Sequence, residues 1–163
     1  MAFVLFISFI ILLRIGELIL SRSNERWLLQ NGAIEYGQKH YPYIVALHVL
    51  FIVALIIEYS TKQTASFSMF FLVLYFLLLA FKARVITTLG KFWNTKIYHI
   101  QGFPLMKNGV YKYIKHPNYL IVIAEIAIIP LVFQLYFTAI VFTLLNAIML
   151  SVRVKEENKV LKI

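Results

Sequence analysis

The sequence contains no cysteine and no aspartate, and charged residues of all kinds make up only 14% of its 163 residues. The absence of cysteine excludes disulfides, thiolate chemistry and Cys-based metal sites. Four scattered histidines without such partners do not form a metal-ligand pattern, so we predict no metal site. Hydrophobic residues reach 61%, whereas a soluble domain averages roughly 45–50% apolar and about 25% charged residues. This composition indicates an integral membrane protein.

Acidic residues are scarce relative to basic ones. Seven glutamates stand against 16 Lys and Arg, so the formal net charge is +9. In a soluble protein such an excess would suggest a nucleic-acid partner. In a membrane protein, the anionic inner leaflet and the positive-inside rule explain the excess first. We therefore expect contacts with membrane lipids and none with nucleic acid.

The apolar residues are gathered in blocks, and a block of about 20 helical residues covers the roughly 30 Å hydrocarbon core of a bilayer. The last two blocks are separated only by Gln134 and Leu135, which predicts a tight helical hairpin with short arms, and Pro130 should kink or end its first arm. Whether these two arms cross the whole bilayer is left open. The five blocks are residues 2–20, 43–59, 66–83, 118–133 and 136–152.

These blocks predict an all-α polytopic membrane protein with five transmembrane helices and a C-terminal helical hairpin. We expect one integral membrane domain over 1–163, with front helices over 1–83 and a cofactor-binding and catalytic core over 84–163. The first block carries Arg14 and Glu17 and lacks both a basic leader and a small-residue cleavage site. It is therefore predicted to be a retained helix and not a removable signal.

The basic residues are distributed very unevenly over the loops. Residues 21–42, 84–117 and 153–163 hold 13 Lys and Arg, whereas the loops on the opposite side hold only Lys62. This asymmetry predicts an external amino terminus and a cytoplasmic carboxyl terminus, consistent with five crossings. The two long loops lie on the cytoplasmic side, so we expect the active site at that face.

The stretch GVYKYIKHPNY, residues 109–119, combines features that suit an anion-binding or cofactor site. Its tyrosines offer aromatic surface and its lysines offer positive charge. Pro117 favours the first turn of the following helix, which leaves His116 at the helix boundary. The backbone N–H groups at such a boundary can receive a carboxylate. An ordinary interfacial belt in front of a helix explains the residues equally well.

The second notable stretch is RVKEEN, residues 153–158, directly after the last apolar block. Arg153 and Glu157 are four residues apart and share one helix face, whereas Glu156 shares it less well. By itself this is a membrane-proximal charge cluster. The hairpin, however, must bring His116 and Arg153 to the same side at the same depth, which predicts one polar pocket.

Together these stretches resemble the isoprenylcysteine carboxyl methyltransferase family, whose pattern is Gly-x-Tyr-x-x-x-Arg-His-Pro-x-Tyr followed, after a helical hairpin, by Arg ahead of paired Glu. The resemblance covers about residues 102–161, and the front half is similar to a bacterial branch. Lys115 replaces the usual arginine, which keeps the charge but loses a bidentate fork. Ile121 stands where many members have glycine.

The resemblance implies a membrane methyltransferase that uses S-adenosylmethionine and releases S-adenosylhomocysteine in a bacterial cell membrane. The acceptor would be lipophilic, either a prenylated substrate with an isoprenylcysteine-type carboxylate or the hydroxyl of a long-chain amphiphile such as an alkylpyrone. Arg153 and Glu157 would be the catalytic pair. The residues expected at the cofactor are Tyr111, Tyr113, Lys115, His116, Pro117, Tyr119 and Glu156.

Polar residues elsewhere are weaker candidates. Arg14 and Glu17 are expected to pair and reach the inner surface, with Glu17 available to substrate. Glu125 lies about two turns inside the fourth helix, where a carboxylate must be paired, protonated or at a pocket, so we include it among the cofactor-binding residues. His40 and Tyr41 precede a helix on the inner side and are assigned to substrate binding.

Three further expectations and two alternatives complete the interpretation. Trp27 and Trp93 are expected to anchor the interface, Glu58 is expected to be exposed near the outer end of its helix, and a homodimer stays open. The alternatives are a small multidrug-type transporter with Glu17 or Glu125 as proton carrier, and an NADPH-dependent reductase related to the sterol reductases. Large inner loops argue against the first, and the small number of predicted helices against the second.

Overall fold

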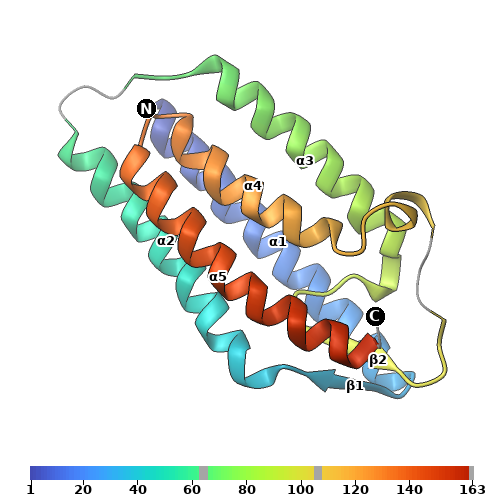
Figure 1. Cartoon of the computed structure of the whole chain (residues 1–163). Helices are drawn as coiled ribbons and strands as arrows, with labels where there is room; N and C mark the ends of the chain where they lie inside the picture. Colours follow the sequence, from blue (N-terminus) through green and yellow to red (C-terminus); the bar gives the residue numbers. More distant parts are fainter. Residues whose placement is uncertain (63–65, 105–107, 162–163) are drawn as a thin grey trace.

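The protein is an up-and-down bundle of five helices, seen here in a computed structural model that describes residues 1–62, 66–104 and 108–161 (Figure 1). The helices are α1 (Ala2–Gln30), α2 (Tyr41–Thr61), α3 (Met69–Leu89), α4 (Pro117–Leu131) and α5 (Tyr136–Leu161). Short 3-10 turns, η1 (Gln38–His40), η2 (Gly90–Phe92) and η3 (Gly109–Lys112), occur in the loops. The predicted polytopic all-α fold is confirmed.

The helices form where the apolar blocks were found, but most of them are longer. Four of the five are long and apolar enough to cross a membrane, and α4, with 15 residues, is the shorter apolar helix. At 1.5 Å per residue, α4 is about 22 Å long. It begins at Pro117 and ends one residue after Pro130, as predicted for a residue that cannot donate a helical hydrogen bond. Its partner α5 has 26 residues, so the expectation of two short arms is wrong for α5.

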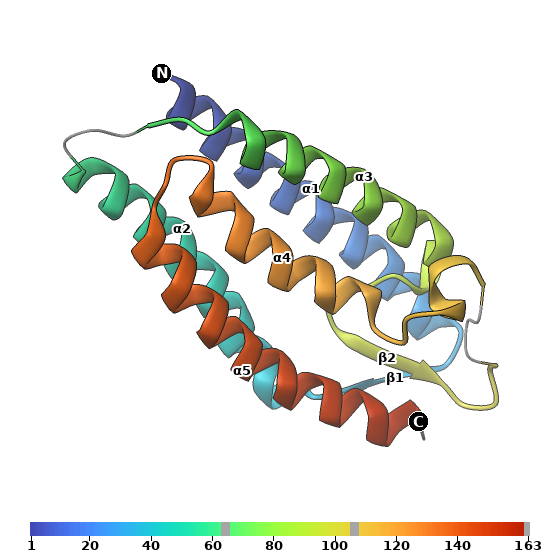
Figure 2. The same cartoon turned by 45° about the horizontal axis from the view of Figure 1, so that its top comes forward.

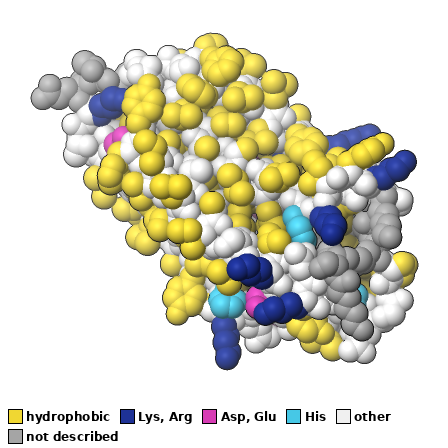
Figure 3. Space-filling view, in the orientation of Figure 1, with side chains coloured by type: hydrophobic (Ala, Val, Ile, Leu, Met, Phe, Trp, Pro, Cys, Tyr) yellow, Lys and Arg dark blue, Asp and Glu magenta, His cyan; other side chains and the backbone are white. Residues whose placement is uncertain are grey.

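The bundle has one polar, basic end, which we call the basic end. The ends of α1, α3 and α5 lie there together with the starts of α2 and α4 (Figure 2). Hydrophobic side chains cover much of the visible bundle surface, while Lys and Arg gather mainly at this end (Figure 3). The three basic segments of the sequence therefore share one end, as the charge count required. Two of their lysines, Lys107 and Lys162, lie outside the described residues.

The sequence analysis missed a small β-sheet at the basic end. Strand β1 (Ala33–Tyr36) pairs antiparallel with β2 (Ile97–Ile100), with Ala33 opposite Ile100. A polar network lies beside it: Lys96 forms ion pairs with Glu25 at 2.8 Å and Glu35 at 3.5 Å. The Tyr98 hydroxyl donates to Glu25 at 2.6 Å, and burial together with these carboxylates raises the pKa of Tyr98. The sheet thus joins the first long loop to the second.

At the opposite end, aromatic rings fill the core between α1, α2 and the hairpin turn. Phe3 stacks on Tyr59 with ring centroids 3.7 Å apart and meets Phe133 edge-on at 5.2 Å. The carboxylate of Glu58 accepts hydrogen bonds from the backbone N–H groups of Phe137 and Thr138 at 3.2 and 2.7 Å, near the start of α5. Glu58 is half-buried, so its expected surface role is replaced by a capping role.

Four charged side chains form a network inside the bundle between α1, α3 and α4. Arg14 pairs with Glu17 at 2.8 Å and with Glu125 at 2.7 Å, and Lys82 lies 3.0 Å from Glu125 and also pairs with Glu17. The predicted Arg14–Glu17 pair is present, but it does not extend to the inner surface. Two cations meet two carboxylates, so the network is neutral overall, which lowers the cost of burying it.

Candidate active site

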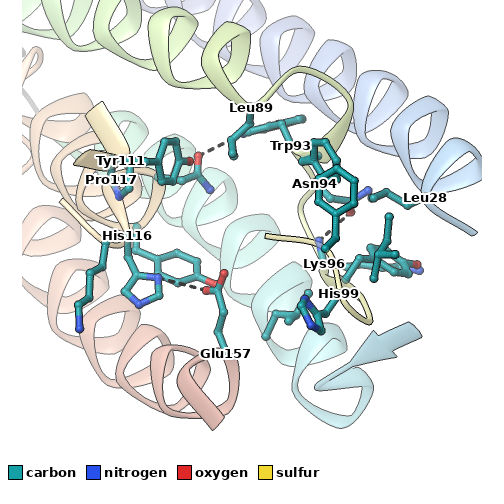
Figure 4. Close-up of a pocket in the computed structure, with 18 of the residues that line it drawn as sticks. Leu28, Leu89, Trp93, Asn94, Lys96, His99, Tyr111, His116, Pro117 and Glu157 are labelled. Atoms are coloured by element: carbon teal, nitrogen blue, oxygen red, sulfur yellow. Dashed lines mark hydrogen bonds and ion pairs between the residues drawn. The ribbon is translucent and has the colours of Figure 1, made fainter. Parts of the chain in front are cut away.

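A cavity of about 560 Å³ opens at the basic end, between the start of α4, the end of α5, β2 and the loop after α3. Its volume is within the 300–1,000 Å³ that is usual for small-molecule sites. Most of the residues proposed from the two sequence motifs line it (Figure 4). These are Tyr111, Lys115, His116, Pro117, Tyr119, Arg153 and Glu157.

The turn that begins the first motif depends on a glycine. Gly109 has φ +57°, a conformation that side chains other than glycine rarely adopt. A Cβ there would also lie 3.2 Å from the Thr88 side chain on α3. This close approach brings η3 against the end of α3 and places Tyr111 at the cavity wall. Burial, and then the charge of Glu157, raise the pKa of Tyr111, which keeps it a neutral phenol.

His116 is the residue before the first turn of α4 and contacts α5 with both ring nitrogens. Its Nε2 lies 2.8 Å from Asn158 Oδ1, and its Nδ1 lies 3.4 Å from Glu157 Oε2. The Glu157 contact raises the pKa of His116, burial opposes this shift, and Asn158 adds to it. The histidine and the carboxylate that lie 41 positions apart in the sequence are therefore neighbours at one edge of the cavity.

Arg153 is held by two other groups and is not an exposed ion-pair partner. Its Nε donates to the Tyr119 hydroxyl at 2.9 Å, its Nη2 donates to the Thr95 carbonyl, and its exposed fraction is 8%. The Tyr119 ring lies under the guanidinium at 5.5 Å and stacks beside His116 at 5.5 Å. Within the described part of the chain Arg153 forms no salt bridge with Glu157. The expected surface pair of Arg153 and Glu157 is therefore not formed. Arg153 is buried and fixed, and Glu157 is a separate carboxylate beside it.

Glu157 contributes a buried acceptor. Its Oε2 atom has almost no solvent exposure and no hydrogen bond of good geometry from any described residue, since the His116 contact is long. A buried carboxylate oxygen in this state costs free energy unless a donor reaches it. The nearest group able to satisfy it is the protonated His116 ring, whose Nδ1 lies 3.4 Å away.

A smaller recess of about 10 Å³ lies on the other side of Arg153. The predicted substrate residues His40 and Tyr41 line it, as does Glu156, which was predicted at the cofactor. The carboxylate of Glu156 is paired with Lys159 at 2.9 Å. Arg153 lines both spaces, as do Lys96 and Ile97. The structure therefore separates Glu156 from the main cavity.

Three other predicted site residues lie away from the cavity. Tyr113 is 82% exposed and does not line the cavity, and Lys112 lies over its ring. Glu125 and Glu17 belong to the buried ion-pair network, where Arg14 and Lys82 occupy their carboxylates. A carboxylate inside an apolar helix was rightly expected to need a partner. That partner is a pair of cations on α1 and α3, which the sequence does not place beside α4.

The opposite wall of the cavity was missed by sequence reasoning. Trp93 was expected at the membrane interface, but it is 2% exposed and lines the cavity beside Phe92 and Asn118. The α1 residues Ser21 and Asn24 bind this segment: Asn24 Nδ2 donates to the Trp93 carbonyl at 2.7 Å. In the sequence, the only sign of this contact was that Ser21 and Asn24 are polar residues three positions apart near the end of an apolar helix.

Comparison with known proteins identifies the family of the chain. Residues 71–163 match the model of the isoprenylcysteine carboxyl methyltransferase (ICMT) family, and this range contains both motifs. The uncharacterized protein YpbQ of Bacillus subtilis (strain 168) is 41% identical over 162 residues, with 98% of this chain and 96% of that protein covered. An uncharacterized protein of Haemophilus influenzae is 33% identical over 152 residues, covering 91% of this chain and 88% of that protein.

No solved structure matches the chain. The family match covers more than half of the sequence, and it includes α4, α5 and most of the residues that line the cavity. The chain therefore belongs to the isoprenylcysteine carboxyl methyltransferase family and is a membrane methyltransferase.

Proposed function

We propose that the protein transfers a methyl group from S-adenosylmethionine to the carboxylate or hydroxyl of a lipophilic acceptor, at the cytoplasmic face of a bacterial cell membrane. The observation that carries the proposal is the arrangement of Arg153, Tyr119, His116 and Glu157 around a cavity of about 560 Å³ at the basic end of a membrane bundle. The family match supports the class of reaction.

The cavity residues fit the proposed cofactor. S-adenosylmethionine carries a sulfonium, an ammonium and a carboxylate, so its site needs both an acceptor for cations and donors for an anion. The Glu157 carboxylate lines the cavity as an acceptor, and Lys115 and the Asn118 backbone N–H at the start of α4 offer a positive charge and a hydrogen-bond donor. The aromatic side of the cavity suits a purine. When bound, S-adenosylmethionine supplies an electrophilic methyl group on a good leaving group.

The main task of the chain is to orient the acceptor. Arg153 uses Nε and Nη2 in bonds to Tyr119 and Thr95, and no described residue accepts from its Nη1. A guanidinium fixed at two points needs little reorganisation when its remaining donor binds an anionic oxygen. We assign Nη1 to the acceptor oxygen, because Arg153 borders both the cavity and the smaller recess.

Glu157 and His116 would hold the polar end of the cofactor and any proton released. A carboxylate acceptor reacts without a base. A hydroxyl acceptor has to lose a proton, and the His116–Glu157 pair, 3.4 Å apart, lines the cavity and can receive it. The same residues can thus serve a carboxylate or a hydroxyl acceptor. Whether a base is needed depends on the acidity of the acceptor.

Binding of S-adenosylhomocysteine to the detergent-solubilised protein tests the proposal. Calorimetry in the presence of a chelator should show binding to the wild-type protein. Glu157→Ala should weaken that binding about tenfold or more, because the ligand's ammonium loses its acceptor. The matched control is Glu156→Ala, a neighbouring glutamate outside the main cavity. Absence of binding, or binding restored only by a divalent ion, would refute the proposal.

A further inference from the structure

The two sides of the main cavity differ in chemistry. His116 and Glu157 lie on one side, and Leu28 and Trp93 lie on the other together with Lys96 and His99 (Figure 4). The charged side suits the amino-acid part of the proposed cofactor. A purine is flat and rich in π electrons, and stacking on aromatic side chains stabilises such bases. The base should therefore lie toward the side that contains Trp93, although the indole itself is almost fully buried.

Trp93 is rigidly placed before any ligand binds. Its backbone carbonyl accepts a hydrogen bond from Asn24 Nδ2 at 2.7 Å, and the same amide group donates to the Gly90 carbonyl at 3.2 Å. Its backbone N–H donates to Gly90 at 3.2 Å. A residue fixed in this way can hold a hydrogen-bond partner without a large entropic cost of ordering.

Trp93 also orients a carboxamide at the edge of the cavity. Its indole Nε1–H donates to Asn118 Oδ1 at 3.4 Å, and Asn118 is the second residue of α4. Among the described residues no group accepts a hydrogen bond from the Asn118 amide N–H₂. The carboxamide thus keeps two N–H donors and one oxygen lone pair for a ligand.

A carboxamide with free N–H donors and a free oxygen lone pair is complementary to the edge of adenine. Its oxygen can accept from the 6-amino group while its N–H₂ donates to N7, the bidentate pairing by which Asn and Gln recognise adenine. Hypoxanthine carries an oxygen at position 6, and that oxygen would face Oδ1 as a second acceptor. Such a site therefore distinguishes the two purines.

We propose that Asn118 recognises the base of the cofactor as adenine. Trp93 holds the Asn118 carboxamide in the orientation that this recognition needs. This inference rests on the proposed function, because it assumes that an S-adenosyl compound occupies the cavity. Asn118 contacts the cofactor in this scheme, whereas the indole N–H of Trp93 acts through Asn118 as a positioning group.

Equilibrium binding of two ligands tests the inference without measuring activity. The ligands are S-adenosylhomocysteine and S-inosylhomocysteine, which differ only in the base. The wild-type protein should bind the adenosyl compound at least tenfold more tightly, in line with the usual discrimination of a bidentate pair. In Asn118→Ala, the affinity for the adenosyl compound should fall about tenfold and the ratio should approach one.

Two further variants separate base reading from folding. Trp93→Phe keeps the aromatic wall but removes the indole N–H, so the ratio should fall to an intermediate value. Asn31→Ala changes an exposed asparagine whose side chain bonds only to Trp27 among the described residues, and it should keep the wild-type ratio. If Asn118→Ala fails to fold, Asn118→Leu, which is close in size and lacks the carboxamide oxygen, must show the reduced ratio.

The possible failures are distinguishable. A wild-type protein that binds both ligands equally, or an Asn118→Ala protein that keeps the wild-type ratio, would overturn the role of Asn118 and leave the proposed function standing. A folded wild-type protein that binds neither ligand would refute the proposed function, and the inference would fall with it.

Discussion

Arg153 on α5 and Tyr119 on α4 contact each other in two ways: the guanidinium Nε donates to the phenol oxygen at 2.9 Å, and the guanidinium carbon lies 5.5 Å from the ring centroid. These residues come from the two arms of the hairpin, so their contact joins the two sequence motifs in one site. Because the Thr95 carbonyl holds a second nitrogen of Arg153, the side chain is fixed in both position and plane.

Arg153→Ala should therefore affect both rate and stability. We expect methyl transfer to slow at least a hundredfold, since the donor for the acceptor oxygen is lost. The free energy of unfolding should fall by about 1–3 kcal/mol, because Tyr119 and Thr95 lose a buried partner. Single-turnover methylation on protein of known folded fraction measures the first effect, and thermal melting measures the second.

Arg153→Lys is the informative companion. A single ammonium nitrogen cannot occupy the positions of Nε, Nη1 and Nη2 at once, so little of the rate should return even where stability does. If methyl transfer by Arg153→Ala and Arg153→Lys falls only in proportion to the folded fraction, Arg153 has a structural role and no role in the reaction.

His116 should titrate above its ordinary pKa of 6.5, because Glu157 stabilises the protonated ring. A raised pKa in the folded state contributes stability that is fully present below pH 6.5 and is lost as the pH rises through the folded value. Melting temperatures of the wild-type protein should therefore fall as the pH increases above 6.5. Glu157→Gln should flatten that dependence and move the His116 signal in NMR titrations back toward 6.5. An unchanged His116 titration in this variant would contradict the assignment.

Glu125→Gln should destabilise the fold and not impair the cavity of the folded protein. The change leaves Arg14 and Lys82 with only Glu17 as an anion inside the bundle, and breaking a buried ion pair costs about 3–5 kcal/mol. Glu156→Gln is the control, since its partly exposed pair with Lys159 should contribute no more than about 1 kcal/mol. Thermal melting in detergent compares the two. Equal melting temperatures would show that the network is not needed for stability.

The topology predicted from charge is testable by reporter fusion. The basic end carries the segments with 13 of the 16 Lys and Arg, so it should face the cytoplasm. Fusions after residues 62 and 100 should report opposite sides of the membrane, with the second in the cytoplasm. The same side for both fusions would be incompatible with the up-and-down bundle.

Much of the fold follows from local features of the sequence. Long apolar runs define the helices, and Pro117 and Pro130 mark the ends of α4 because proline lacks the N–H that a helix interior requires. The helical spacing of the last motif, together with the short hairpin turn, was enough to bring His116 and Arg153 together. These signals act within one helix or across one turn, and a single sequence displays them.

The missed features all depend on contacts between distant segments. The pairing of β1 with β2 joins residues more than 60 positions apart, and the strands are only four residues long. Lys82 meets Glu125 because α3 packs against α4, which no periodicity reveals. Trp93 looked like an interface anchor because tryptophan favours that region, but bonds from Asn24 place it inside the cavity wall.

Transfer of a labelled methyl group is the most direct test of the central claim. Membranes containing the wild-type protein should move radiolabel from S-adenosylmethionine into material that partitions into organic solvent. Membranes containing equal amounts of folded Arg153→Ala should show about a hundredfold less transfer or lower. Label in the organic phase that depends on Arg153 would establish a lipid-directed methyltransferase. Equal labelling with the wild-type protein, the variant and empty membranes would contradict it.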